Sequence, residues 1–371
     1  AEEIFKDQKI LKREKFLQLS RLSYLKSKAI YLILLSVLQS FLLCAVGNMI
    51  IELYDNFFYY WILIFSVFVF GNILGLLLSS SFKTIVTIYI IIPLIVIPQM
   101  ILGGAMFKFE NLNKSIGGGH HIPLVSNLMV SRWAYEGIMV AQFSNNKYEK
   151  NIYDYEQLLS DYNYRTSYLY PYLTDLLNDQ LSDNSDESLK CSDTVYNTLV
   201  FEATKPIAQS MLTFDVSDHS VRQANRFIED LTSLYQDKQN ELSRKKDAKI
   251  MEMDRSLGEN ALMNLKRSYH NDNVADIVQN SLSKKKYFVE NSMVYQNYDH
   301  IFLRDHLNED YKVQGSFMYL PVKSFFGNKI STFWYNILII WFFNLILFIV
   351  LYFDWLKKLL DIQIIKNKSF N

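Results

Sequence analysis

Apolar residues gather in two regions of the chain, at about residues 30–107 and 331–355, whereas the sequence between these regions is polar and charged. The first region holds three long apolar runs separated by short polar turns, at residues 29–50, 57–82 and about 84–107. The second region is a single run, at residues 333–353. A bilayer core about 30 Å thick requires roughly 20 apolar residues in a helix. The pattern therefore predicts four transmembrane helices, three followed by one, with a large insert before the last.

The insert carries the periodicity of helices. Apolar residues recur every three or four positions after residue 217, at Val221, Ala224, Phe227, Ile228, Leu231, Leu234 and Tyr235. This spacing predicts one long helix with an apolar face, capped by Ser217 or Asp218 and ending at Gly258. Shorter amphipathic helices are expected over residues 144–206. The predicted fold class is all-α, a multi-pass membrane protein with a mainly helical insert.

Basic residues flank the apolar runs unevenly. The leader before the first run and the tail after the last are rich in lysine and arginine, whereas the turn "ELYDN" carries acids and no base. Because lysine and arginine favour the cytoplasmic side, both chain ends are expected in the cytoplasm and residues 108–328 outside it, with the protein in the inner membrane.

These assignments divide the chain into six parts, in order along the sequence. They are a cytosolic amphipathic coupling-type segment (1–27), three transmembrane helices (28–107), an outer loop with a re-entrant or interfacial helix (108–150), the insert (151–328), the last transmembrane helix (329–356) and a cytosolic basic tail (357–371).

Charge and cysteine content narrow the functional classes. The 38 basic residues balance 38 acidic ones, so no surface of a single sign indicates a nucleic-acid partner. Cys44 lies inside a predicted span and Cys191 stands alone in the insert, which argues against a disulfide framework.

No catalytic constellation is visible in the sequence. The phosphate-binding pattern GxxxxGK[ST] and the metal-binding pattern HExxH are both missing from it. The stretch "GGGHH" at 117–121 places two histidines side by side, which do not share a helix face. We expect no catalytic residues, no metal site and no cofactor bound by this chain.

Polar and small residues inside the predicted spans are the next candidates. Amides lie in or at the ends of the spans at Gln39, Asn48, Asn72, Gln99 and Asn344. An amide inside a membrane either bonds neighbouring helices or lines a path, and bonding between helices is the commoner role. Gly71 and Gly75 lie one turn apart, which allows close helix packing.

The third run contains two helix breakers, Pro93 and Pro98, and closes with the stretch "MILGGAMF". Proline frees a backbone carbonyl in a membrane helix, which is tolerated where protein or a water-filled cavity satisfies it. A second, shorter apolar stretch follows, "IPLVSNLMVSRWAYEGIMVAQF", and its Arg132 and Glu136 make an ordinary crossing difficult.

The order of a proline-bearing helix, "MILGGAMF", an outer loop and "SRWAYEGIMVAQF" resembles ATP-binding cassette exporters of the G, or eye-pigment, subfamily. The leader "KREKFLQLSRLSYLKSKAIYLILLSVLQS" is similar to the cytosolic loop that enters the third helix of those type-2 permeases. The composition is similar to that of half-transporters of Bacteroidetes-type bacteria. The family has six helices after a nucleotide-binding domain, so the resemblance implies the third to sixth helices here, with the ATPase domain and two helices missing from this sequence.

The resemblance also implies roles for named residues. Arg13, Glu14 and Arg21, in a leader helix of about 4–26, would couple the permease to the nucleotide-binding domain. The alternative is that this leader is only a helix at the membrane surface. The gate or substrate path would be formed by Gln99, Met100, Leu102, Gly103, Gly104, Ala105 and Met106. The re-entrant segment would contain Arg132, Trp133 and Glu136, with the two charges satisfied by each other or by water.

The resulting hypothesis is the permease portion of an ATP-driven exporter that works by alternating access on a lipidic or amphipathic substrate. ATP and Mg²⁺ would bind the missing nucleotide-binding domain of the same full-length chain. Its other partners would be membrane lipid and a second permease, in a homodimer or heterodimer. The alternatives are a membrane-anchored interaction module whose outer domain binds a periplasmic partner, and a passive channel, for which no charged ring is evident.

Overall fold

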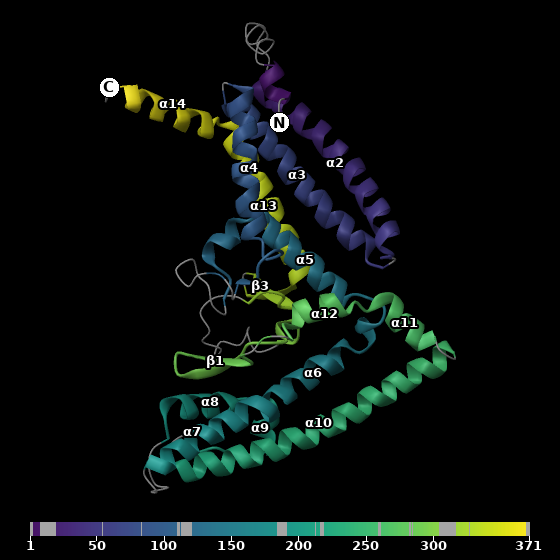
Figure 1. Cartoon of the computed structure of the whole chain (residues 1–371), viewed down its shortest axis with the longest axis vertical. Coiled ribbons are helices and arrows are strands. Elements are labelled where there is room, and N and C mark those ends of the chain that lie inside the picture. Colours follow the sequence, from purple (N-terminus) through teal and green to yellow (C-terminus); the bar gives the residue numbers. More distant parts are fainter. Residues whose placement is uncertain are drawn as a thin grey trace. The chain divides into compact units, whose positions relative to one another are not determined.

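The computed structural model describes residues 3–7, 20–53, 55–82, 84–109, 112, 121–183, 191–211, 213–215, 219–258, 261–281, 283, 285–303, 317–325 and 327–368. The chain divides into two compact units (Figure 1). Unit 1 comprises Ala1–Ala141 and Ile330–Asn371, and unit 2 comprises Gln142–Lys329.

Long apolar helices make up most of unit 1. They are α2 (Arg21–Ile51), α3 (Phe57–Ser81), α4 (Ile85–Ile101) and α13 (Thr332–Tyr352). A 3-10 turn η4 (Leu124–Leu128) precedes α5 (Val130–Ser144), and α14 (Trp355–Lys368) follows α13. Residues 3–7 are also helical.

Three described helices are long and apolar enough to cross a membrane, over Leu22–Ile51, Phe57–Ser81 and Thr332–Tyr352. The first, second and fourth predicted runs therefore form helices of spanning length. The third run differs, because α4 has 17 residues and ends at Ile101, not near residue 107. The Gly103–Gly104 pair explains this early end, since Gly104 has φ 81°, a left-handed conformation that stops a helix.

Helix α3 packs against α2, α13 and α14 of unit 1. A hairpin joins α2 to α3 (Figure 1), turning through Glu52 and Asn56, whose φ angles are 58° and 64°. At one end of α3, Leu76 and Leu77 pack with buried apolar residues of three other segments, Ile4, Leu25 and Leu351. The predicted leader helix of about 4–26 is therefore helical at 3–7, and the first long helix begins earlier than expected, at Arg21.

Unit 2 is mostly helical. Its helices are η5 (Glu149–Asn151), α6 (Tyr153–Tyr164), α7 (Tyr170–Asp183), α8 (Asp193–Ala203), α9 (Pro206–Met211), α10 (Val221–Leu257), α11 (Ala261–Tyr269), α12 (Asp272–Gln279) and η7 (His300–Phe302). A π-helical segment, η6 (Arg165–Leu169), joins α6 to α7.

The long helix α10 confirms the periodicity argument. It ends at Leu257 before Gly258, and six residues of the predicted face are buried: Val221, Ala224, Phe227, Ile228, Leu231 and Tyr235. The seventh, Leu234, is half-buried, and Met253 is buried further along. The cap differs from the prediction, because Ser220 accepts the Gln223 N–H at 3.3 Å; Ser217 and Asp218 lie outside the described residues. The apolar face packs on α6, α7 and α8.

Two small sheets depart from the all-α prediction. Strands β1 (Tyr287–Glu290) and β2 (Met293–Gln296) form an antiparallel hairpin in which Tyr287 pairs with Gln296. Strands β3 (Val322–Phe325) and β4 (Asn328–Ser331) form the second sheet. All four residues of β2 are buried, so no two-residue alternation marks this strand in the sequence.

Candidate functional site

Helix α5 packs against α3 and α13. Its buried residues Val130, Trp133, Ala134 and Ala141 form one apolar cluster with Leu63 of α3 and with Phe333, Ile337 and Ile340 of α13. A Cβ at Gly137 would lie 2.6 Å from Leu63 Cδ1, so glycine permits this close approach. The predicted re-entrant segment is therefore a buried helix of unit 1.

A charged network lies inside this packed cluster. Arg132 and Glu136 are both fully buried, and Arg132 Nη2 lies 3.3 Å from Glu136 Oε2. Asn336 of α13 donates from Nδ2 to Glu136 Oε2 at 3.0 Å and to the Trp133 carbonyl at 2.9 Å. The Arg132 guanidinium also lies 3.9 Å from the centre of the Trp133 indole. The expected pairing of Arg132 with Glu136 is therefore present, and Asn336 connects it to α13.

The sequence analysis did not identify Asn336 as a candidate. It lies near the start of the last apolar run, and an amide in such a run is a signal that was applied to Asn344 but not to Asn336. Removing one partner of a buried ion pair costs roughly 3–5 kcal/mol, because the other charge then stays buried alone, so the packing of α5 requires both charges or neither.

The end of α4 is joined to the start of α5. The Ser131 N–H donates to Gln99 Oε1 at 3.1 Å, and its hydroxyl donates to the Gln99 carbonyl at 2.5 Å. A Cβ at Gly103 would lie 2.7 Å from the Gln99 carbonyl oxygen and 2.9 Å from Ser131 Oγ. Two of the predicted gate residues, Gln99 and Gly103, therefore make contacts within the chain.

The other predicted gate residues lie nearer the surface of unit 1. Met100, Ala105 and Met106 are exposed, and Leu102 and Gly104 are half-buried. The apolar side chains of Met100 and Met106 have exposed fractions of 51% and 59%.

A cavity of about 290 Å³ lies between α2, α3 and α4 of unit 1. Its lining is mainly apolar and includes Leu32, Gly71, Asn72, Gly75, Ile92 and Val96. A Cβ at Gly71 would meet no atom within 4 Å, so the packing of the described helices does not require glycine there.

The span amides act mainly between helices. Asn72 of α3 donates to Ser36 Oγ of α2 at 2.7 Å, and Asn344 of α13 donates to the Ser66 carbonyl of α3 at 3.3 Å. Trp341 of α13 also donates to Ser66 Oγ at 3.1 Å. The expectation that these amides bond helices to one another is confirmed for Asn72 and Asn344.

The proposed coupling residues are only partly within the structure. Arg13 and Glu14 lie outside the described residues, and Arg21 is the first residue of α2. The described connection between the leader and the long helices is formed by other residues. Lys28 Nζ lies 3.1 Å from Glu3 Oε2 and 2.9 Å from Asp7 Oδ2.

The leader makes two more hydrogen bonds to the long helices. The Tyr24 hydroxyl donates to Asp7 Oδ2 at 2.8 Å, and the Phe5 N–H donates to Ser79 Oγ of α3 at 2.8 Å. Sequence reasoning overlooked these contacts, although a lysine at the entry of an apolar run signals a charge that needs a partner.

Within the described residues, no group of three or more histidine, cysteine, aspartate or glutamate side chains is arranged to hold a metal. Most of the "GGGHH" stretch lies outside those residues; His121 is the member that lies within them.

Comparison with known families finds one match, in the first part of the chain. Residues 2–143 match the family model described as ABC-2 type transporter. The matched segment contains α2, α3, α4 and nearly all of α5, and it covers less than half of the chain. The match supports the permease part of an ATP-binding cassette transporter, a component that normally pairs with an ATP-binding cassette. No curated protein and no solved structure matches the chain.

Proposed function

We propose that this chain is the permease portion of an ATP-driven exporter of the ATP-binding cassette superfamily, similar to the G subfamily and of Bacteroidetes-type bacterial origin. The observation that carries the proposal is the family match over residues 2–143, in a segment that contains two helices of spanning length. ATP and Mg²⁺ would bind a nucleotide-binding domain on the same full-length chain, and this chain would form the path.

The proposed topology has four crossings, with both ends cytoplasmic and residues 108–328 outside the inner membrane. Helix α4 would be the third crossing. Its 17 residues give a length of about 25 Å, at the lower end of the range for a spanning helix. Lysine-rich flanks at both chain ends support this orientation.

The proposed gate is the exposed end of α4 together with the residues that follow it. Apolar side chains exposed in a membrane contact either lipid or protein, and Met100 and Met106 are more than half exposed in a single chain. We place a second permease against them, in a homodimer or heterodimer, with Leu102 completing the apolar constriction. Gly103 would keep α4 tightly joined to Ser131, so that α4 and α5 move together when the gate opens.

The proposed coupling pathway begins at the leader. Arg13, Glu14 and Arg21 would contact the nucleotide-binding domain, and the ion pairs of Lys28 with Glu3 and Asp7 would transmit the movement to α2. The α5 network of Arg132, Glu136 and Asn336 would join the re-entrant helix to α13 while α4 and α5 move together.

A transport assay tests the function. The full-length protein, with its nucleotide-binding domain, is reconstituted in lipid vesicles, and ATP hydrolysis and ATP-dependent movement of a fluorescent phospholipid are measured. A variant whose nucleotide-binding domain cannot hydrolyse ATP serves as the control. ATP-dependent movement of the lipid supports the exporter. Hydrolysis without movement refutes a lipid substrate, and the absence of ATP hydrolysis favours the membrane-anchored interaction module.

Cross-linking tests the gate. Single cysteines are introduced at Met100 and Met106 in a background without Cys44 and Cys191. Met49, at the end of α2 and 79% exposed, is the matched control position. Cross-links between two copies at Met100 or Met106 but not at Met49 support the proposed gate. Equal cross-linking at all three positions contradicts it.

A further inference from the structure

Helix α14 follows the last apolar helix almost directly. Helix α13 has 21 residues and is apolar enough to cross a membrane, and its length of about 32 Å matches the thickness of a bilayer core. It ends at Tyr352, and α14 begins at Trp355. Asp354 lies between them with φ 52°, a left-handed conformation that interrupts the helix. Helix α14 therefore begins where a spanning α13 leaves the bilayer.

The interruption changes the direction of the chain. Helix α14 does not continue along the axis of α13 but runs sideways from its end (Figure 1). Its first turn is attached to the rest of unit 1, because Leu356 packs on the apolar cluster that contains Leu76 of α3 and Leu351 of α13. A helix that leaves a spanning helix sideways at the membrane surface runs along that surface.

One side of α14 is apolar and exposed. Trp355, Leu359 and Ile362 are spaced by four and three residues, so they lie on the same side of the helix. All three side chains are more than half exposed. Leu356 makes the contact with unit 1, so this exposed stripe is an additional apolar surface.

The stripe has the residue types of a helix at a lipid surface. Tryptophan favours the boundary between lipid and water, because its ring is apolar and its N–H is polar. The Trp355 ring stacks on the exposed ring of Phe353, with 5.7 Å between the ring centres. Lys357 and Lys358 follow at once and are both exposed. Because a lysine is costly inside hydrocarbon, these two residues place the start of α14 at the level of the headgroups.

The charge of α14 is mainly positive. Its sequence contains four lysines, Lys357, Lys358, Lys366 and Lys368, and one acidic residue, Asp361. Near the start of α2, Lys26 is exposed beside Leu25, which belongs to the apolar cluster that Leu356 joins. Positive charges at the level where helices leave a membrane attract the phosphates of anionic lipids.

We propose that α14 is an interfacial helix that binds the surface of an anionic phospholipid bilayer. The stripe of Trp355, Leu359 and Ile362 enters the boundary between headgroups and acyl chains, and the lysines contact lipid phosphates. The connection to α13 selects this occupant, because a bilayer crossed by α13 lies beside α14 and a soluble partner would have to displace it. The proposal requires that α13 crosses the membrane and does not depend on the transport function proposed above.

The lysines determine how strongly the helix prefers anionic lipid. A lysine near an anionic surface strengthens binding by about fivefold. Two exposed lysines, Lys357 and Lys358, should therefore shift the equilibrium between bound and free α14 by about thirtyfold. This contribution should decrease at high salt, because the charges are exposed and the range of their interaction falls to about 3 Å at 1 M salt.

Thiol modification of the full chain in lipid nanodiscs tests the proposal. Cys44 and Cys191 are replaced, and a single cysteine is introduced at Leu359 or at Ile362. Lys357→Cys is the matched control, because residues two positions apart lie on nearly opposite sides of a helix. The rate of reaction with an uncharged, water-soluble polyethylene glycol maleimide is measured in nanodiscs of phosphatidylcholine alone and of phosphatidylcholine mixed with phosphatidylglycerol.

The bound helix should hide the stripe from the reagent. We expect Leu359→Cys and Ile362→Cys to react slowly in the mixed nanodiscs, and Lys357→Cys to react as an exposed thiol does. Reaction at the two stripe positions should become faster in phosphatidylcholine alone and at high salt.

A change of charge separates lipid binding from burial by protein. In the mixed nanodiscs, Lys357→Gln/Lys358→Gln should raise the reaction rate of Leu359→Cys by about thirtyfold. In phosphatidylcholine alone, the same change should leave the rate unaltered. Lys245→Gln/Lys249→Gln on α10 is the control, because it removes the same charge from another exposed helix surface and should have no effect in either lipid.

The outcomes are distinct. Protection of Leu359 and Ile362 relative to Lys357, with a dependence on anionic lipid, supports the interfacial helix. Equal reaction at all three positions refutes it. Protection that depends on neither lipid charge nor salt overturns it as well, because a protein surface then covers the stripe. The two lipid mixtures are compared with Lys357 and Lys358 intact in both stripe variants, so this comparison decides the proposal even if the glutamine variant does not fold.

Discussion

The buried pair of α5 gives the sharpest prediction from the structure. Arg132→Met keeps an unbranched apolar stem of similar shape but leaves the negative Glu136 carboxylate fully buried without the positive charge beside it. Removing one member of a buried pair costs roughly 3–5 kcal/mol. The hydrogen bond from Asn336 to Glu136 is present before and after the change, so it does not alter this cost. We therefore expect a destabilisation of about 3–5 kcal/mol.

A double-mutant cycle distinguishes pairing from packing. Glu136→Met alone leaves a buried guanidinium, which cannot lose its proton, so it should be as costly as Arg132→Met. The double variant Arg132→Met/Glu136→Met buries no charge and should recover most of the loss, since a buried pair and an apolar replacement differ little in stability. Asn336 keeps its hydrogen bond to the Trp133 carbonyl in that variant.

The assay measures the folded fraction of the purified protein in detergent as the SDS concentration is increased. The reasoning requires a coupling energy of at least about 2 kcal/mol between Arg132 and Glu136. A coupling energy of only about 0.6 kcal/mol, the average for polar pairs between membrane helices, would refute a strong interaction between the two charges. That result would mean that the unfolded chain in the detergent satisfies both charges equally well.

Three further predictions concern single positions. Burial raises the pKa of Asp299 to about 6, against the hydroxyl of Ser160, which donates to Oδ2 at 2.6 Å. The folded state therefore binds this proton more tightly than the unfolded state, and the stability of the fold decreases as pH rises from 3.8 through about 6. Asp299→Asn should stabilise unit 2 at pH 8 by up to about 3 kcal/mol and give no gain at pH 3, as measured by hydrogen exchange. Gly103→Ala should lower the free energy of unfolding by about 1–3 kcal/mol, because the added Cβ would meet a backbone carbonyl. Gly71→Ala is the control and should be neutral or stabilising, because its Cβ would meet no atom. Equal effects of the two changes would contradict the α4–α5 contact. Lys28→Met should increase exchange over residues 3–7 and lower ATP hydrolysis by the full-length protein; unchanged exchange would show that the ion pairs do not hold the leader.

Hydropathy and periodicity predicted the elements that depend on local sequence. The long helices α2, α3 and α13 follow from runs of about 20 apolar residues, because a backbone in lipid must satisfy its own hydrogen bonds. The end of α10 at Gly258 follows from a residue that stops helices. The β1–β2 hairpin was missed because its turn is Asn291–Ser292, both with positive φ, and not the Asn-Gly pair that marks such turns in a sequence.

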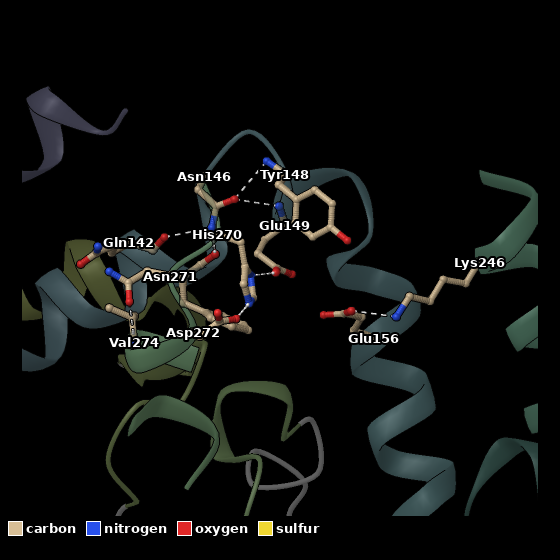
Figure 2. Close-up of polar contacts among 11 residues, drawn as sticks. Gln142, Asn146, Tyr148, Glu149, Glu156, Lys246, His270, Asn271, Asp272 and Val274 are labelled. Carbon is tan, nitrogen blue, oxygen red and sulfur yellow. Dashed lines mark hydrogen bonds and ion pairs between the residues drawn. The ribbon is translucent and has the colours of Figure 1, made fainter. Parts of the chain in front are cut away.

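The sequence by itself determined that this is a membrane protein with apolar helices, a mainly helical insert and an ABC-2-like first part. The tertiary structure alone decided which polar groups meet. Asn336 reaches Glu136 across 200 positions, and His270 reaches Glu149 across 121 (Figure 2). A hydropathy pattern records how each residue prefers water or lipid, whereas a buried hydrogen bond depends on the positions of two helices. The packing of α5 against α13, and of α10 beside α6, therefore brought together polar groups that lie too far apart in the sequence for a local pattern to pair.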